Sequence, residues 1–81
     1  MNQDFAQAMQ RFIEHIRQRH PTSSTATHYQ NDLEQFVRVV DKAPRAVTRA
    51  DVSRFVTAQL TEALNPATIN RRLATLSSFF E

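Results

Sequence analysis

Apolar residues recur every three or four positions in four separate stretches of the chain, which is the spacing of helices that bury one face. The first stretch predicts a helix from about residue 4 to residue 19. Pro21 ends it, because proline disfavours helical geometry in the residue before it, here His20. The buried positions of this helix are predicted to be Phe5, Ala8, Met9, Phe12 and Ile16, with Ile13 beside them.

Hydroxyl residues at positions 22–25 supply candidate N-caps for a second helix, which is expected to end near Val40. Its apolar stripe predicts the buried residues Ala26, Tyr29, Leu33, Phe36, Val37 and Val40. At about 100° per residue, the opposite face carries Ser24, Thr27, His28, Asn31, Gln35 and Arg38. This helix is therefore expected to bury one side and to present small polar groups on the other.

Residues 41–47, which include Pro44, are expected to form a loop before a third helix. Thr48 and Asp51 have the spacing of a capping box, with the shorter aspartate at its acidic position. The third helix is expected to run to about Leu60. Its buried residues are predicted to be Val52, Phe55, Val56 and Leu60.

Asn65 and Pro66 predict the start of a fourth helix, as an N-cap followed by proline at the first helical position. Its buried positions are predicted to be Ile69, Leu73, Leu76 and Phe80, flanked by Phe79. Projection places Arg71 opposite the core, Thr68, Thr75 and Ser78 around it, and Asn70 and Arg72 on the two flanks. The pattern as a whole predicts an all-α fold of four short helices around one core.

Composition narrows the possible functions. The 81 residues suit one small domain, residues 1–81, with an ordinary 41% of hydrophobic residues. The absence of cysteine excludes disulfides and thiolate metal sites, and is compatible with a reducing cytosol. No apolar run approaches the roughly 18 residues of a membrane span, so we expect a cytoplasmic protein without a membrane partner. The absence of glycine excludes the glycine-rich loops that hold nucleotide phosphates.

The charged residues favour nucleic acid only mildly. The net charge is +2, but nine of the ten cationic residues are arginines. The planar guanidinium suits contacts to phosphates and to base edges. The same small surplus also fits proteins that have no anionic partner.

No constellation of catalytic residues is evident. The three histidines, His15, His20 and His28, lack the spacing that places two metal ligands on one helical face, and each is interpreted as solvated. Tyr29 falls on the apolar stripe of the second helix and is interpreted as a core residue rather than a nucleophile. We therefore expect no catalytic residue, no metal site and no cofactor.

The fourth helix carries the strongest functional signal. Its small hydroxyl and methyl side chains allow close approach to DNA, and its arginine and asparagine residues suit phosphate or bidentate base contacts. The residues concerned are Thr68, Asn70, Arg71, Arg72 and Thr75. The plain alternative is that the two arginines only solvate an amphipathic helix, and the pattern leaves both interpretations open.

The polar face of the second helix offers a similar surface. Its candidate DNA-contacting residues are Thr25, Thr27, His28 and Asn31. Two such helices together could straddle a major groove. Ser24 and Thr25 also fit a plain capping role equally well.

Three segments carry a resemblance to a known family. Residues 25–36 (TATHYQNDLEQF) are similar to its T…Y…DL..F helix, and residues 47–55 (VTRADVSRF) resemble its hydrophobic-T..D…F helix start. Residues 66–80 (PATINRRLATLSSFF) are similar to its T-I-N-R-R-L-A-x-L-x-x-F-[FY] signature. The family is that of the N-terminal core-binding domains of tyrosine recombinases, the phage integrase and Xer-like proteins. The resemblance implies a compact orthogonal four-helix bundle with a SAM-like fold.

The resemblance also implies a function. In this family the second and fourth helices address the major groove of a recombination half-site, which would place Thr25, Thr27, His28, Thr68, Asn70, Arg71 and Arg72 on the DNA side. The family often has a glycine before the fourth helix, where this chain has Leu64 and Asn65, and asparagine tolerates the left-handed conformation. We expect the family's C-terminal catalytic domain, with its tyrosine nucleophile, to lie outside these 81 residues, and Tyr29 does not match that tyrosine.

We therefore expect a fragment of a longer recombinase that binds double-stranded DNA without cutting it. It would be monomeric in isolation and would touch neighbouring recombinase protomers on DNA. The alternative is a helical protein-interaction module anchored by Phe79, Phe80 or Phe5. A repressor-like helix-turn-helix protein is a weaker third possibility, because the glycine-containing turn that such proteins often use is absent.

Overall fold

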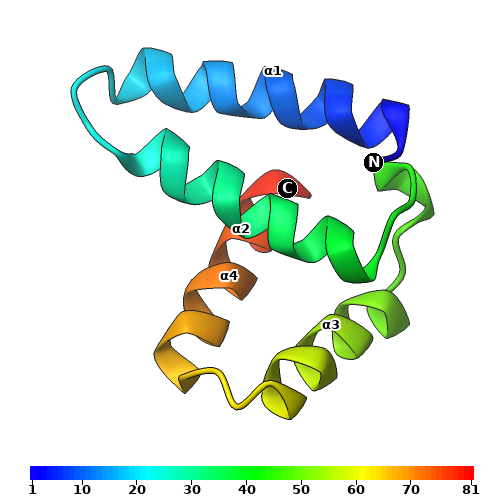
Figure 1. The fold of residues 1–81 in the computed structure, drawn as a ribbon. Coiled ribbons are helices and arrows are strands. Elements are labelled where there is room, and N and C mark those ends of the chain that lie inside the picture. The colour runs from blue at the N-terminus through cyan, green and yellow to red at the C-terminus, as the bar shows by residue number, and fades with distance from the viewer.

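Four α-helices and one short 3₁₀ helix follow each other along the chain in the computed structural model, which describes all 81 residues (Figure 1). They are α1 (Gln3–Arg19), α2 (Thr25–Val39), η1 (Pro44–Ala46), α3 (Arg49–Thr61) and α4 (Pro66–Phe79). There is no strand. The predicted all-α fold of four helices is confirmed, and the 3₁₀ helix occupies the predicted loop.

Local capping chemistry sets the helix starts. Thr48 Oγ1 accepts a hydrogen bond from the Asp51 N–H at 3.2 Å, and Asp51 Oδ2 accepts one from the Thr48 N–H at 2.9 Å. This is the predicted capping box of α3. Asn65 Oδ1 accepts from the Ala67 N–H at 2.8 Å, with Pro66 at the first helical position, as predicted for α4.

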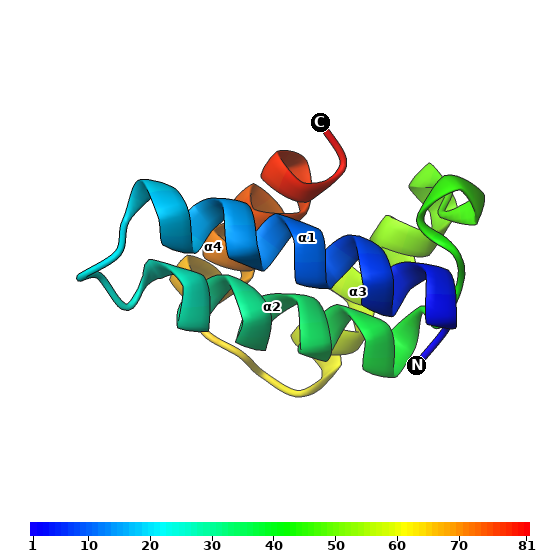
Figure 2. The same cartoon turned by 90° about the horizontal axis from the view of Figure 1, so that it is seen from above.

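α2 is the helix around which the others are arranged. It runs antiparallel to α1 and also packs against both α3 and α4 (Figure 1). α3 and α4 diverge from a short turn, and α4 crosses the α1–α2 pair, as the view from above also shows (Figure 2). The main buried apolar cluster draws on all four helices and consists of Phe5, Leu33, Phe36, Val37, Val40, Phe55 and Leu76. No helix combines the length and the apolar composition that a membrane crossing requires.

Aromatic rings close this core at the end of α4. Phe5 is completely buried, and its ring centroid lies 5.1 Å from that of Phe79. Phe80, which caps α4, is 37% exposed, although its ring still lies 4.9 Å from that of Phe79. The prediction that Phe80 is buried is therefore wrong. So is the suggestion that Phe5 anchors a partner protein, because no surface of its side chain is accessible.

α3 turns a different face inward from the predicted one. Phe55 is buried as predicted, but Leu60 is 61% exposed and Val52 and Val56 are only partly buried. The buried residues of α3 are Asp51, Phe55 and Gln59, which are spaced by four and form one stripe. The helix is rotated by about one residue, because Asp51 and Gln59 have polar partners on the inner side.

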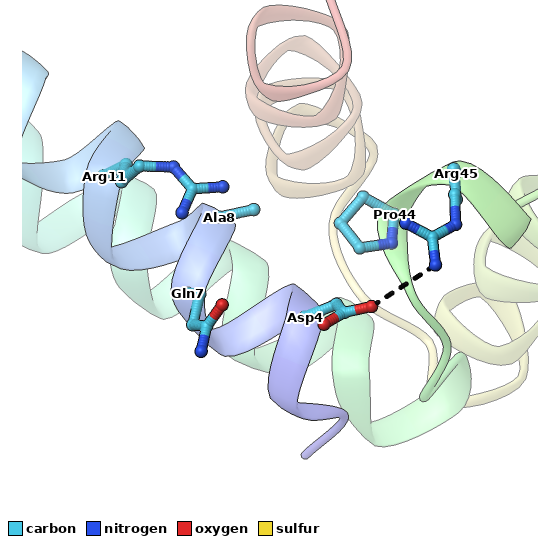
Figure 3. A pocket seen from close by; sticks show the side chains of 6 residues that line it. All are labelled: Asp4, Gln7, Ala8, Arg11, Pro44 and Arg45. Carbon is cyan, nitrogen blue, oxygen red and sulfur yellow. Dashed lines mark ion pairs between the residues drawn. The ribbon is translucent and has the colours of Figure 1, made fainter.

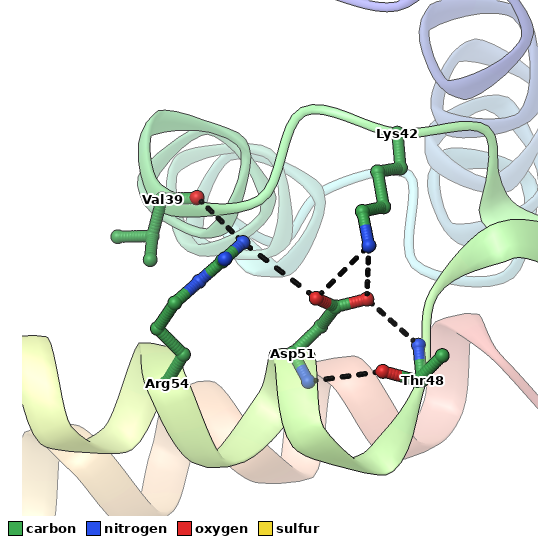
Figure 4. A network of polar contacts seen from close by, with 5 residues as sticks. All are labelled: Val39, Lys42, Thr48, Asp51 and Arg54. Atoms are coloured by element: carbon green, nitrogen blue, oxygen red, sulfur yellow. Dashed lines mark hydrogen bonds and ion pairs between the residues drawn. The ribbon is translucent and has the colours of Figure 1, made fainter.

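A buried carboxylate fixes the start of α3 to the end of α2 (Figure 4). Lys42 Nζ lies 3.1 and 3.0 Å from the two carboxylate oxygens of Asp51. Arg54 Nη2 lies 3.6 Å from Asp51 Oδ1 and donates to the carbonyl oxygen of Val39 at 3.3 Å. The hydrogen bond from the Thr48 backbone N–H, followed by that from Lys42, holds the pKa of Asp51 below its ordinary value.

The turn between α3 and α4 contains the one left-handed residue of the chain. Ala63 has φ of 58°, whereas Asn65 is extended with φ of −61°. The Leu64 N–H donates to the carbonyl of Gln59 at 3.1 Å, and the Ala63 N–H donates to that of Leu60 at 3.0 Å. These two bonds form a Schellman motif. The left-handed position is therefore Ala63, not Asn65, and a β-carbon occupies a position that favours glycine.

Ala63→Gly is expected to stabilise the protein. It relieves the left-handed strain of about 1–2 kcal/mol at the cost of the greater chain entropy of glycine, so the free energy of unfolding should rise by roughly 0.5–1 kcal/mol. Urea unfolding followed by circular dichroism measures this change. Ala74→Gly, at an exposed helical position of α4, is the matched control and should lower stability by about 1 kcal/mol. Destabilisation by both changes would contradict a left-handed Ala63.

Asp51→Asn is expected to lower stability in a pH-dependent way. Because the folded pKa of Asp51 is lowered, the contribution of its carboxylate is present above the ordinary pKa of about 3.9 and is lost as pH falls through the folded value. The gap in unfolding free energy between the wild type and Asp51→Asn should therefore be largest near neutral pH and shrink below about pH 4. Urea unfolding between pH 7 and pH 2.5 measures that gap. A gap that stays constant over this range would contradict the assignment.

Candidate nucleic-acid interface

The polar faces of α2 and α4 meet at one buried carboxylate, that of Asp32 on α2. Its side chain is 2% exposed. Arg71 Nη2 donates to Asp32 Oδ1 at 2.8 Å, and the Thr75 hydroxyl donates to Asp32 Oδ2 at 2.8 Å. Both partners lie on α4, one helical turn apart, so the carboxylate joins the two helices that are predicted to contact DNA.

Arg71 occupies a position between core and solvent. Its side chain is 53% exposed, and one Nη group is bound to Asp32. It therefore does not point straight away from the core, as the helical projection predicts, but leans toward α2. Since a guanidinium has five N–H donors, the group still offers donors to an anion in solvent.

Arg72 lies deeper than its flanking position predicts. Its side chain is only 16% exposed. Arg72 Nη1 donates to Gln59 Oε1 on α3 at 3.0 Å, and its Nε lies 3.9 Å from Asp32 Oδ1. Arg72 therefore connects α4 to α3, while Arg71 connects α4 to α2.

Thr75 is not on the outer face. Its side chain is buried at 1% exposure, with the hydroxyl on Asp32. The prediction that Thr75 surrounds Arg71 on the DNA side is therefore wrong, because the buried carboxylate draws the hydroxyl inward. Elsewhere on α4, Asn70 is exposed and Thr68 is partly exposed, as the projection predicts.

The predicted residues of α2 divide into two groups. Thr27, His28 and Asn31 are exposed along the helix that carries Asp32. Thr25 is partly buried at the start of α2, where its N–H donates to Ser23 Oγ at 2.9 Å and its hydroxyl pairs with that of Ser23. Ser24 is the N-cap residue of α2, but its side chain makes no capping hydrogen bond, and the Thr25 hydroxyl accepts from no backbone N–H, so the predicted side-chain capping by these two residues is not observed.

Asp32 and Gln59 are the two residues of this site that sequence reasoning missed. Asp32 lies directly beside the apolar stripe of α2, where an unpaired charge is costly. Arg71 and Thr75, four residues apart, lie on one side of α4, but helical spacing alone does not show that this side faces Asp32. Gln59 follows Phe55 by four residues on α3. That spacing puts Gln59 on the same side of α3 as Phe55, but only its contact with Arg72 explains why a polar amide is buried there.

The largest groove lies on another part of the surface, between α1 and η1 (Figure 3). It has a volume of about 320 Å³ and is lined by Asp4, Gln7, Ala8, Arg11, Pro44 and Arg45. Arg45 Nη2 lies 3.6 Å from Asp4 Oδ2, and both side chains are exposed, so the pair contributes little to stability. The groove holds no hydroxyl, thiol or imidazole, and so offers no nucleophile–base pair.

Thr75→Val is expected to destabilise the fold. The substitution keeps the shape of the side chain but removes a hydrogen bond to a buried carboxylate, which costs about 2 kcal/mol. Thermal unfolding and urea unfolding measure the loss. The control is Thr68→Val on the same helix, which should change stability by less than about 0.5 kcal/mol. If Thr75→Val were neutral or stabilising, as for a threonine that only packs, the role assigned to this hydroxyl would be wrong.

Comparison with known proteins gives the family. The sequence model of the family described as "Phage integrase, N-terminal SAM-like domain" matches residues 8–81. The chain is also 34% identical over 70 residues to a tyrosine recombinase XerC of Thermodesulfovibrio yellowstonii (strain ATCC 51303 / DSM 11347 / YP87). That alignment covers 85% of this chain but only 23% of the relative, so the chain spans about a quarter of the relative's length. No solved structure matches it significantly. With the match covering nearly all of a four-helix fold, the chain belongs to the phage integrase N-terminal SAM-like domain family.

Proposed function

We propose that this chain is the DNA-binding module of a longer tyrosine recombinase, and that it binds one face of a recombination half-site through α2 and α4. In this proposal the chain binds double-stranded DNA without cutting it, and neighbouring protomers touch each other once they are on DNA. Phosphate contacts dominate, so binding is weakly specific and strongly dependent on salt.

The observation that carries the proposal is the half-exposed guanidinium of Arg71, which Asp32 holds beside the exposed polar residues of α2. Asn31 precedes Asp32 in the chain, and His28 lies one turn earlier. A guanidinium held by one carboxylate loses less conformational freedom when it binds a phosphate, and its remaining N–H groups suit the phosphate oxygens.

Each residue has a proposed role. Arg71 is the outer phosphate anchor, and Arg72 is a second anchor that lies deeper, between α3 and α4. Asn70, exposed at the side of α4, positions the backbone or contacts a base edge. Thr27, His28 and Asn31 provide the facing contacts from α2, while Thr25 and Thr68 lie nearer the helix starts.

The alternative of a protein-interaction module has less support. Of its three suggested anchors, Phe5 is fully buried and Phe79 is partly buried against it, which leaves Phe80 at the edge of the core. Leu60 is the other exposed large apolar side chain of the helices. Two separate side chains on different helices are ordinary for a soluble surface.

Arg71→Ala is expected to weaken binding to a generic 20-base-pair duplex by about tenfold at low salt, the effect of one charge-assisted contact. It should also reduce by about 1 the slope of log affinity against log salt. Fluorescence anisotropy at several salt concentrations measures both. Wild-type affinity and slope in a folded Arg71→Ala protein would count against α4 as the contact surface.

The control for this experiment is Arg11→Ala, which removes the same charge from an exposed position in the groove between α1 and η1. At about 0.1 M salt it should change affinity by less than about twofold, because exposed charges separated by more than the screening length of about 10 Å interact weakly. Amide spectra of both variants verify the fold, since Arg71 also binds Asp32. Backbone amide shifts on α2 and α4 that salt reverses are expected in the wild type. Self-association in sedimentation without any shift would favour the protein-interaction module.

A further inference from the structure

Two buried N–H donors at the junction of α2, α3 and α4 donate to no protein atom. They are Gln59 Nε2 and Arg72 Nε. Gln59 is 3% exposed, and its Oε1 accepts from Arg72 Nη1 at 3.0 Å. Because arginine can only donate, this bond fixes the amide oxygen toward Arg72 and leaves the amide nitrogen as the group that needs an acceptor. A buried donor without an acceptor is costly, so both groups favour an incoming acceptor.

A small recess lies beside these two residues. It has a volume of about 70 Å³ and is lined by Gln59 and Arg72 together with residues of α2 and the end of α3. Among its polar lining residues are Gln35 and Arg38 on α2, both on the face predicted to meet DNA, and Glu62. Arg38 and Arg72 thus bring two positive charges to the recess and Glu62 one negative charge, while Asp32, 3.9 Å from Arg72 Nε, partly offsets the charge of Arg72.

The free side-chain groups of Gln59 and Arg72 are donors, which suits a phosphate oxygen and excludes the bidentate reading of adenine. A glutamine reads adenine by using its oxygen and its nitrogen together, but the Gln59 oxygen is already bound to Arg72. What remains is a set of donors, and phosphate oxygens only accept. Arg72 Nε lies 3.9 Å from Asp32 Oδ1, beyond hydrogen-bond distance, so the nearby carboxylate does not satisfy it.

We propose that this recess receives one backbone phosphate of bound DNA, and that the Gln59 and Arg72 side chains turn toward it on binding, so that Gln59 Nε2 and Arg72 Nε, which are buried in the free protein, donate to its non-bridging oxygens. Arg38, which is exposed, adds charge at the rim, and Glu62 limits the net attraction. The proposal rests on the DNA-binding function and extends it, because it makes α3 a third contributor to the surface formed by α2 and α4. Gln59 then both positions Arg72 and contacts the DNA.

The side-chain N–H groups themselves provide the test. In uniformly ¹⁵N-labelled wild-type protein, the Gln59 amide pair is assigned by its loss in Gln59→Met. Adding a generic 20-base-pair duplex at low salt is expected to shift this pair and the Arg72 Nε–H, together with the backbone amides of α2 and α4. Inorganic phosphate at the same phosphate concentration is expected to leave the pair in place, because a free ion lacks the flanking contacts of the duplex.

Variants give a second measurement. Gln59→Glu keeps an oxygen for Arg72 but replaces the amide donor with a negative charge, and should weaken duplex binding by about tenfold. Gln59→Met removes donor and acceptor without adding charge, and should weaken it severalfold. Gln18→Glu, at an exposed position on α1, is the control for added charge and should change affinity by less than about twofold.

The outcomes separate this proposal from the one on which it rests. Shifts of the α2 and α4 amides without any shift of the Gln59 side chain would overturn the phosphate site and leave DNA binding intact. A Gln59 shift with inorganic phosphate but not with the duplex would also overturn it, since the recess would then take a free anion. No shift anywhere with the duplex would overturn both proposals.

Discussion

A carboxylate inside a protein must be surrounded by donors, and the way Asp32 meets this requirement determines how α2 and α4 pack together. Asp32 lies beside Leu33, which is part of the core, so the charge cannot reach water without moving α2. Its donors, Arg71 and Thr75, are one turn apart on α4. Sliding α4 by one residue would put Leu76 in place of the Thr75 hydroxyl and leave a buried charge without its partner. The contacts of Asp32 with Arg71 and Thr75 thus favour a single register of α4 against α2.

The same contact links stability to function. Arg71 is at once a structural partner of Asp32 and a half-exposed guanidinium of the candidate interface, whereas Arg72 lies mostly buried between α3 and α4. The proposed DNA surface is therefore not a set of free side chains added to a finished fold. It is the exposed edge of the polar network that connects α2, α3 and α4. This network fixes the geometry of the surface before DNA binds, but its carboxylate partly neutralises the positive charge of the arginines.

The helix ends could be predicted from the sequence because caps are local. The capping box of Thr48 and Asp51 and the cap formed by Asn65 and Pro66 each involve residues within three positions of one another. The buried face of α3 and the inward orientation of the Thr75 side chain could not be predicted from the sequence, because both depend on partners that are distant in the chain. Gln59 turns inward to meet Arg72, thirteen residues later, and Thr75 meets Asp32 across 43 positions. Periodicity ranks positions by apolarity and cannot anticipate a polar group that is buried by its partner.

The clamp at the start of α3 has a practical consequence for labelling. The chain contains one lysine, and Lys42 Nζ binds both oxygens of Asp51. The other amino group, at Met1, lies 3.7 Å from Asp41 Oδ2. An amine-reactive dye therefore attaches only at groups that hold ion pairs, and coupling at Lys42 removes the cation from the joint between α2 and α3. Because the chain has no cysteine, a thiol introduced at an exposed position of α1 would carry a probe at one defined place and leave that joint intact.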